Sequence, residues 1–160
     1  MAERVFTQTF GVAGAILEKD GKILLVRENT KGHERGKWNQ PAGWIDVGEN
    51  PVAAAIKEVK EETGLDFEPA GLVGIYSVVK DKRELDGNIH HAIKLIFTGR
   101  ITGGQLISSN DEIMEVKWFD PAEIQGMTGE TLRDIDIKKE VNDYFAGKIF
   151  PLDIISHTLV

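Results

Sequence analysis

The sequence has 160 residues, of which 41% are hydrophobic and 28% are charged, as in an ordinary globular domain. Its formal net charge of −7 disfavours tight binding to long DNA or RNA, because neutralising phosphates requires clustered Lys and Arg. The absence of cysteine excludes disulfides, thiolate metal sites and cysteine nucleophiles, and no stretch approaches the roughly 18 apolar residues of a membrane span. We therefore expect one cytoplasmic domain over residues 1–160, with no membrane segment.

The first half of the chain predicts short strands. Residues 11–17 and 22–27 are apolar, strand-length runs, and Lys19-Asp20-Gly21 between them is typical of a hairpin turn. The polar stretch 28–37 is predicted to be a loop, and residues 38–45 are predicted to be one short extended segment.

A helix is predicted next, from Pro51 to Thr63. Proline suits a first helical turn, and Gly64 suits the position just after a helix end. The apolar stripe expected to face the core consists of Val52, Ala55, Ile56, Val59 and Thr63.

The second half predicts two further strands, residues 72–79 and 91–98, separated by a polar loop over 80–90. A short strand at 115–119 and an amphipathic helix over 131–145 follow. Strands and helices in this order predict mixed α/β packing.

Three acidic residues of the first helix share one side of it. Glu58, Glu61 and Glu62 stand at i, i+3 and i+4, where like charges destabilise an isolated helix by a few tenths of a kcal/mol per pair. A hard divalent cation removes that repulsion, and Mg²⁺ is typically held by carboxylates together with substrate phosphates. The pattern predicts a Mg²⁺ site, with Mn²⁺ as the alternative ion.

The spacing from Gly43 to Leu65 resembles the Nudix box of the Nudix hydrolases. That box reads Gly, five residues, Glu, seven residues, then Arg-Glu-aliphatic-x-Glu-Glu-x-Gly-aliphatic. The matching positions are Gly43, Glu49, Glu58, Val59, Glu61, Glu62, Gly64 and Leu65, whereas Lys57 stands where the family has Arg. The alternative, a Glu-rich solvated helix, has no need for Gly43 and Glu49 at fixed offsets.

The resemblance implies an α/β fold, an α/β/α sandwich with a mixed central sheet in which the box forms loop–helix–loop. It implies that Glu58, Glu61 and Glu62 bind the metal together with the backbone carbonyl of Gly43. Either Glu58 or Glu61 would be the general base, and we favour Glu58. Glu112, in an acidic run before a Trp-containing strand, would complete the metal site, unless that run is simply solvated.

Lys57 would orient the box glutamates, as the family's Arg does. The lysine ammonium is a point charge and cannot bond to a carboxylate through two N–H groups as the planar arginine guanidinium does. We therefore expect the substitution to affect the catalytic rate more than metal binding. It could pair with Glu61 one turn on or with Glu49 across the loop, and a plain helical ion pair is the alternative role.

The segment Trp38-Asn39-Gln40-Pro41-Ala42-Gly43 and the tail at 150–155 are similar to the NudJ-type phosphatases, a Nudix subgroup that acts on nucleoside tri- and diphosphates and a thiamine-precursor diphosphate. Trp38 and Asn39 are therefore candidate substrate contacts, and Arg35 and Lys37 could meet phosphates. A core position for Trp38 and a solvated loop for the two cations are the alternatives.

The leading hypothesis is Mg²⁺-dependent hydrolysis of a phosphoanhydride in a nucleoside di- or triphosphate or a related small diphosphate, by a monomer or homodimer. The alternatives are an ADP-ribose or dinucleoside polyphosphate pyrophosphatase on the same fold, and a non-catalytic Nudix-fold ligand sensor. The three retained glutamates favour an enzyme.

Overall fold

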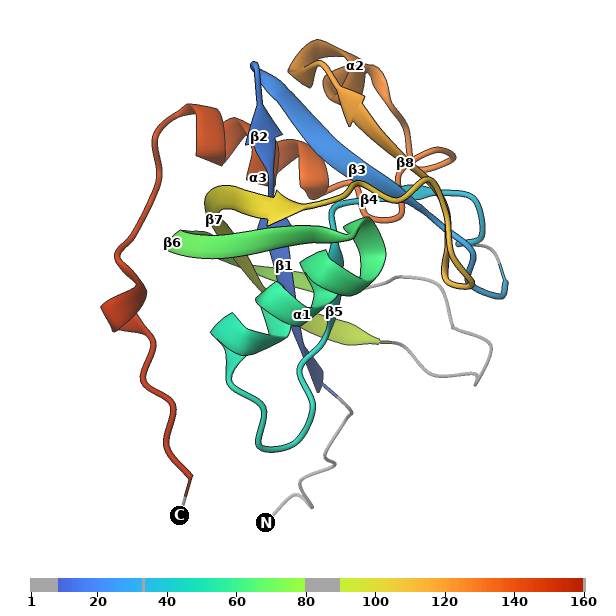
Figure 1. Ribbon diagram of the computed structural model, residues 1–160. Coiled ribbons are helices and arrows are strands. Elements are labelled where there is room, and N and C mark those ends of the chain that lie inside the picture. The colour runs from blue at the N-terminus through green and yellow to red at the C-terminus, as the bar shows by residue number, and fades with distance from the viewer. Residues whose placement is uncertain (1–8, 33, 80–89, 160) are drawn as a thin grey trace.

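The computed structural model describes residues 9–32, 34–79 and 90–159, and its chain is arranged around two sheets (Figure 1). The first sheet has the strand order β5 (Ala42–Trp44), β1 (Thr9–Ile16), β7 (His91–Gly104) and β6 (Leu65–Val79). Strands β1 and β7 run parallel and the other pairs antiparallel, so the sheet is mixed.

The second sheet is built on β3 (Lys22–Glu28). This strand pairs antiparallel with β2 (Glu18–Lys19), β4 (Trp38–Asn39) and β8 (Ile113–Phe119). The short helix α2 (Pro121–Gly126) follows β8 directly.

Helices cover both faces of the first sheet. Helix α1 (Pro51–Thr63) packs against β1, β5 and β6, and α3 (Ile137–Phe145) contacts β6. The core accordingly has two parts. Ala54, Ala55 and Val59 belong to one cluster, and Ile137 and Val141 belong to the other. This arrangement confirms the expected α/β fold with helices on either side of a mixed sheet.

The box helix has the predicted bounds because its two ends are capped. Asn50 accepts hydrogen bonds at Oδ1 from the N–H groups of Val52 (2.8 Å) and Ala53 (3.4 Å). Gly64 ends the helix in the left-handed conformation (φ 78°), which favours glycine. Most of the predicted stripe is buried or partly buried, but Ile56 is 39% exposed.

The predicted hairpin is wrong in extent. A turn does occur at Asp20-Gly21, but it joins β2 to β3, whereas β1 lies in the other sheet beside β5 and β7. The position of β1 is set by its parallel pairing with β7, which is distant in sequence. A turn motif between β1 and β3 cannot predict such a long-range pairing.

Residues 38–45 are divided between the sheets instead of forming one extended segment. Strand β4 belongs to the second sheet and β5 to the first, and the Pro41 carbonyl between them accepts a hydrogen bond from Ala15 N–H at 3.0 Å. The crossing places Gly43 at the edge of the first sheet, next to α1.

The helix predicted over residues 131–145 begins only at Ile137. Asp134 to Ile137 alternate polar and apolar side chains, and the segment before them makes backbone hydrogen bonds with Trp38 through Thr131 and Arg133 instead of helical ones. The sequence prediction also missed α2. The predicted loop over 80–90 lies outside the described residues except for His90. None of the described helices combines the length and apolarity needed to cross a membrane.

We expect Asn50→Ala to lower the stability of the fold by about 1 kcal/mol, because it removes the acceptor that caps α1. That loss corresponds to a melting temperature lower by about 2–4 °C in a chain of this size. Thermal unfolding followed by circular dichroism measures it. Asn50→Asp, which keeps an acceptor, is the matched control, and an equal loss in both variants would contradict the capping role.

Asp143 of α3 links the helix to the sheet. It accepts hydrogen bonds from the Tyr76 hydroxyl (3.1 Å) and from the Nζ atoms of Lys139 and Lys148 (2.7 Å each). The two lysines hold the pKa of Asp143 at about 2, below its ordinary value of 3.8. Because the folded pKa is the lower one, the stabilisation is present above the ordinary pKa and is lost as the pH falls toward 2.

We therefore expect Asp143→Asn to lower the melting temperature at near-neutral pH, and the gap to the unsubstituted protein to narrow between about pH 4 and pH 2. Calorimetry across that range tests this expectation. A gap that stays constant as the pH falls would show that the charge of Asp143 does not contribute.

Candidate functional site

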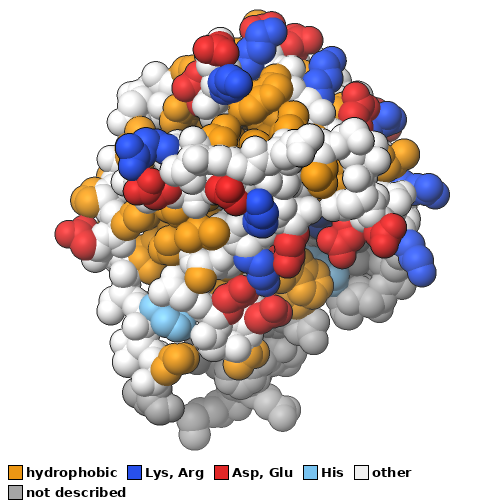
Figure 2. All heavy atoms as spheres, in the orientation of Figure 1, with side chains coloured by type: hydrophobic (Ala, Val, Ile, Leu, Met, Phe, Trp, Pro, Cys, Tyr) orange, Lys and Arg blue, Asp and Glu red, His pale blue; other side chains and the backbone are white. Residues whose placement is uncertain are grey.

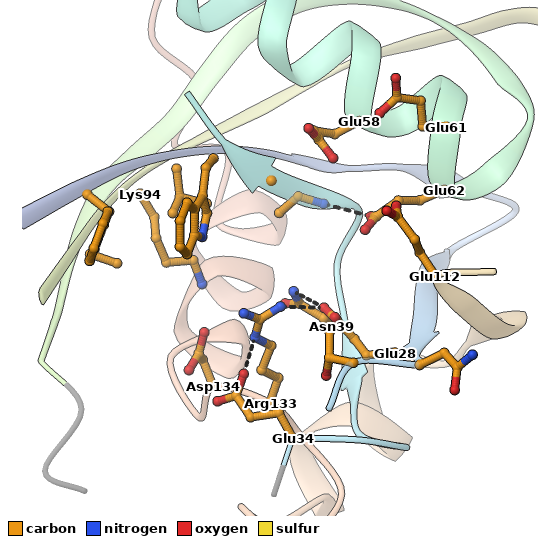
Figure 3. A pocket seen from close by; sticks show the side chains of 18 of the residues that line it. Glu28, Glu34, Asn39, Glu58, Glu61, Glu62, Lys94, Glu112, Arg133 and Asp134 are labelled. Carbon is orange, nitrogen blue, oxygen red and sulfur yellow. Dashed lines mark hydrogen bonds and ion pairs between the residues drawn. The ribbon is translucent and has the colours of Figure 1, made fainter. Parts of the chain in front are cut away.

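A cavity of about 710 Å³ opens where the box helix, the edge of the first sheet and the end of β3 meet (Figure 3). Most of its charged lining is acidic, and the acids come from distant segments of the chain. They are Glu28, Glu34, Glu58, Glu61, Glu62, Asp111, Glu112 and Asp134. Figure 2 shows Asp and Glu side chains gathered on the side of the molecule where α1 ends.

The box helix brings its three glutamates, Glu58, Glu61 and Glu62, to this cavity. Glu62 is 7% exposed and accepts a hydrogen bond from the Ala42 backbone N–H at 2.9 Å, which ties α1 to β5. Glu58 is partly buried, and Glu61 is exposed to the opening. Glu112 reaches the same cavity from the loop before β8 (Figure 3).

Gly43 lies so close to the Glu58 side chain that any side chain at position 43 would have to displace the Glu58 carboxylate. A Cβ atom at this position would overlap the carboxylate of Glu58. The glycine of the box is therefore explained by the close approach of β5 to α1.

The electrostatics of the acidic wall favour a bound cation. Burial raises the pKa of Glu62 well above its usual range, and the charge of Glu28 raises it further. Burial likewise raises the pKa of Glu58, although Lys57 opposes this shift. Carboxylates that are costly to ionise together are stabilised in the charged form by a divalent cation.

The residues present fit a hard divalent cation in their donor chemistry. Among the described residues no three acidic or histidine side chains converge on a single point. Nevertheless Glu58, Glu61 and Glu62 offer oxygen ligands on one wall, and Mg²⁺ prefers oxygen ligands.

Lys57 lies behind the acidic wall and connects the box loop to the helix. Its Nζ is 2.8 Å from Glu49 Oε1, 3.6 Å from Glu58 Oε1 and 3.7 Å from Asp46 Oδ2. The hydrogen bond between Lys57 and Glu49 lowers the pKa of Glu49 and raises that of Lys57. Of the two pairings expected for Lys57, this is the one across the loop.

Arg133 supports the opposite wall. Its Nη1 is 2.7 Å from Glu28 Oε1, and its Nε is 2.7 Å from Glu34 Oε2. Asn39, one of the predicted substrate contacts, lines the cavity and donates its amide N–H to Glu28 Oε1 at 2.9 Å. Sequence reasoning missed Glu28 and Arg133, because residues 105 apart in the chain form no local motif.

The other predicted substrate contacts are not among the described residues that line the cavity. Trp38 packs edge-on against Phe119, with ring centroids 4.8 Å apart, in a core cluster. Lys37 donates to the Gly129 carbonyl at 2.7 Å, and Arg35 is exposed on the loop. A direct role for these three in substrate binding stays a prediction.

Comparison with known proteins gives consistent matches. The NUDIX domain family matches residues 7–140. The chain is 30% identical over 145 residues to an ADP-ribose pyrophosphatase of Methanocaldococcus jannaschii, covering 91% of this chain and 78% of the relative. It is 25% identical over 142 residues to the phosphatase NudJ of Escherichia coli, covering 88% and 86% respectively. A NUDIX hydrolase structure from Nitrosomonas europaea matches with a TM-score of 0.82 and 32% identity, covering 94% of this chain and 98% of that one.

The chain is a Nudix hydrolase. The matches confirm the resemblance inferred from the box, including similarity to NudJ, although the identity to the ADP-ribose pyrophosphatase is higher. In the structure the box begins in the edge strand β5, continues through a loop, and forms helix α1, whose glutamates line the cavity.

Gly43→Ala should lower the turnover of this Nudix hydrolase by about 100-fold, because an added methyl group must displace the Glu58 carboxylate and a shift of about 1 Å can cost that much. Gly126→Ala is the matched control, since a Cβ there meets nothing within 4 Å. Steady-state rates of both variants test the prediction. Turnover of Gly43→Ala equal to that of the control would contradict it.

Proposed function

We propose that this protein hydrolyses a phosphoanhydride bond in a nucleoside di- or triphosphate, or in a related small diphosphate, with Mg²⁺ bound at the box glutamates. The observation that carries the proposal is the presence of Glu58, Glu61 and Glu62 on one wall of a single cavity, next to a glycine that leaves room for them. A divalent ion bound there would supply charge neutralisation on phosphoryl oxygens and a water of lowered pKa.

The roles of this chain's own residues follow from their positions. Glu58, Glu61 and Glu62 would hold the ion with the Gly43 carbonyl, and Glu112 would act from the facing loop. A carboxylate oxygen that is not used in coordination would accept the proton of the attacking water, and we assign this role to Glu58 in preference to Glu61.

Lys57 acts as a positioning residue. It contacts Glu49 and Glu58 and is not among the described residues that line the cavity. Its point charge holds the loop against the helix and reduces repulsion at Glu58, which is the part of the family arginine's role that lysine can take over.

ADP-ribose is the second candidate substrate. The relative from Methanocaldococcus jannaschii is named for that activity and is more similar to this chain than NudJ is. A nucleoside di- or triphosphate and ADP-ribose both contain a diphosphate joined to a nucleoside, so both would present the same type of bond to the carboxylates. A non-catalytic sensor is disfavoured because the acids of the box are all retained.

The test is a panel of phosphate- and pyrophosphate-release assays with Mg²⁺. It covers nucleoside tri- and diphosphates, ADP-ribose, dinucleoside polyphosphates and thiamine-precursor diphosphates. Turnover of simple nucleotides supports the leading proposal, and turnover of ADP-ribose alone supports the second. If folded protein with added Mg²⁺ or Mn²⁺ releases neither phosphate nor pyrophosphate from any compound of the panel, both proposals are overturned.

Within that panel, Glu62→Gln should reduce turnover by about 100-fold or more while leaving the fold intact. The amide keeps an oxygen that can accept the Ala42 N–H and removes one charge from a wall where burial and Glu28 oppose ionisation. Without metal, the melting temperature should be unchanged or slightly higher. Glu68→Gln, an exposed acid on β6, is the control, and near-normal turnover in Glu62→Gln would show that the site is misplaced.

A further inference from the structure

One face of the first sheet forms the floor of the cavity beside β5. In the strand register, Val12 lies opposite Trp44 on one side and Lys94 on the other, and Phe10 lies opposite Ala92. Paired residues, and residues two apart in a strand, point to the same face. All five line the cavity.

Two aromatic rings dominate this floor. The rings of Phe10 and Trp44 are stacked, with centroids 4.8 Å apart and an interplanar angle of 23°. The ring of His90 meets Phe10 edge-on at 5.3 Å. Trp44 is nevertheless 56% exposed, so a large flat indole surface faces the cavity instead of the core.

The aromatic floor and the carboxylates lie on opposite sides of a single edge strand. Gly43 and Trp44 are neighbours in β5, and successive residues of a strand point to opposite faces. The missing side chain of Gly43 would point at Glu58, so Trp44 points away from it. Because the cavity includes both, one ligand can reach across β5 from the indole to the acidic wall.

The chemistry of the floor suits a neutral, flat group rather than a phosphate. Of the five floor residues named above, Lys94 carries a positive charge, but it is 3% exposed and its Nζ is engaged by Asp136 (3.1 Å) and Glu140 (2.7 Å). The charges around Lys94 are thus balanced or acidic, which disfavours an anionic group. An exposed indole stacks on a π-face of any base.

We propose that Trp44, supported by Phe10, is the platform on which the nucleobase of the substrate stacks, which makes Trp44 the residue that selects nucleotides over diphosphates lacking an aromatic group. This inference rests on the proposed function and names the substrate class of the same site. The base lies on one side of β5, and the phosphates reach the box carboxylates around its edge.

The experiment compares Trp44→Ala, Trp44→Leu and Trp44→Phe with the unsubstituted protein. Loss of one base stack should raise KM for nucleoside triphosphates, and Kd for a non-hydrolysable α,β-methylene nucleoside diphosphate, by about 10- to 100-fold in the Ala and Leu variants. Trp44→Phe retains a ring and should recover most of the affinity. The kcat at saturation should change by no more than about twofold, because the carboxylates are untouched.

Two controls separate recognition from structure. Binding of inorganic tripolyphosphate, which has no base, should be equal in all variants. Ile75→Ala removes a 63% exposed apolar side chain from β6, at the opposite edge of the same sheet, and should leave nucleotide affinity unchanged. Circular dichroism confirms that each variant is folded, and Trp44→Leu preserves apolar bulk should Trp44→Ala fail to fold.

The outcomes distinguish this inference from the proposed function. If the nucleotide KM and Kd are unchanged in Trp44→Ala and Trp44→Leu, the platform is overturned and the proposed hydrolysis is unaffected. The same conclusion follows if these variants lose equal affinity for nucleotide and for tripolyphosphate. If the protein hydrolyses no nucleotide but binds the analogue in a way that depends on Trp44, the platform is supported and only the proposed function is overturned. Absence of analogue binding overturns the platform.

Discussion

The close approach of α1 to the edge strand β5 is the constraint on which the site depends. Gly43, where a Cβ atom would overlap the Glu58 carboxylate, and the hydrogen bond from Ala42 N–H to Glu62 mark this approach. The approach buries Glu62 and part of Glu58, and burial is the first cause of the raised pKa values of both. Packing thus keeps carboxylates close together in a cavity where an ion of opposite charge is the natural partner.

The same edge strand separates two kinds of surface within one cavity. Because successive residues of β5 face opposite ways, Gly43 faces the acidic wall and Trp44 forms part of the aromatic floor. A three-residue strand therefore brings a polar, charged region and a flat apolar region within the reach of one small molecule. A ligand with an aromatic ring at one end and phosphates at the other matches this division.

The fold class and the box could be read from the sequence because their signals are local. Asn50, Pro51 and Gly64 fix the ends of α1 by capping, and the glutamates then follow helical spacing. Positions set by pairing between distant segments could not be read in this way. Strand β1 joins β7 in parallel, and Arg133 reaches Glu28 across 105 residues. Trp44 lies within the box, at a position that the box pattern leaves open, and its exposure depends on β5 lying at a sheet edge.

Lys57 shows how a departure from the family pattern is accommodated. Its contacts run to Glu49 at 2.8 Å, and to Glu58 and Asp46 at 3.6 and 3.7 Å, so one ammonium group faces three carboxylates. Arginine would distribute separate N–H groups over these partners, whereas lysine makes one close contact and acts on the others through charge. The strongest constraint therefore falls on the loop acid Glu49. The carboxylate of Glu58 is held on its other side by its close approach to Gly43, where a Cβ atom would overlap it, so the glycine and Lys57 both act on the same carboxylate.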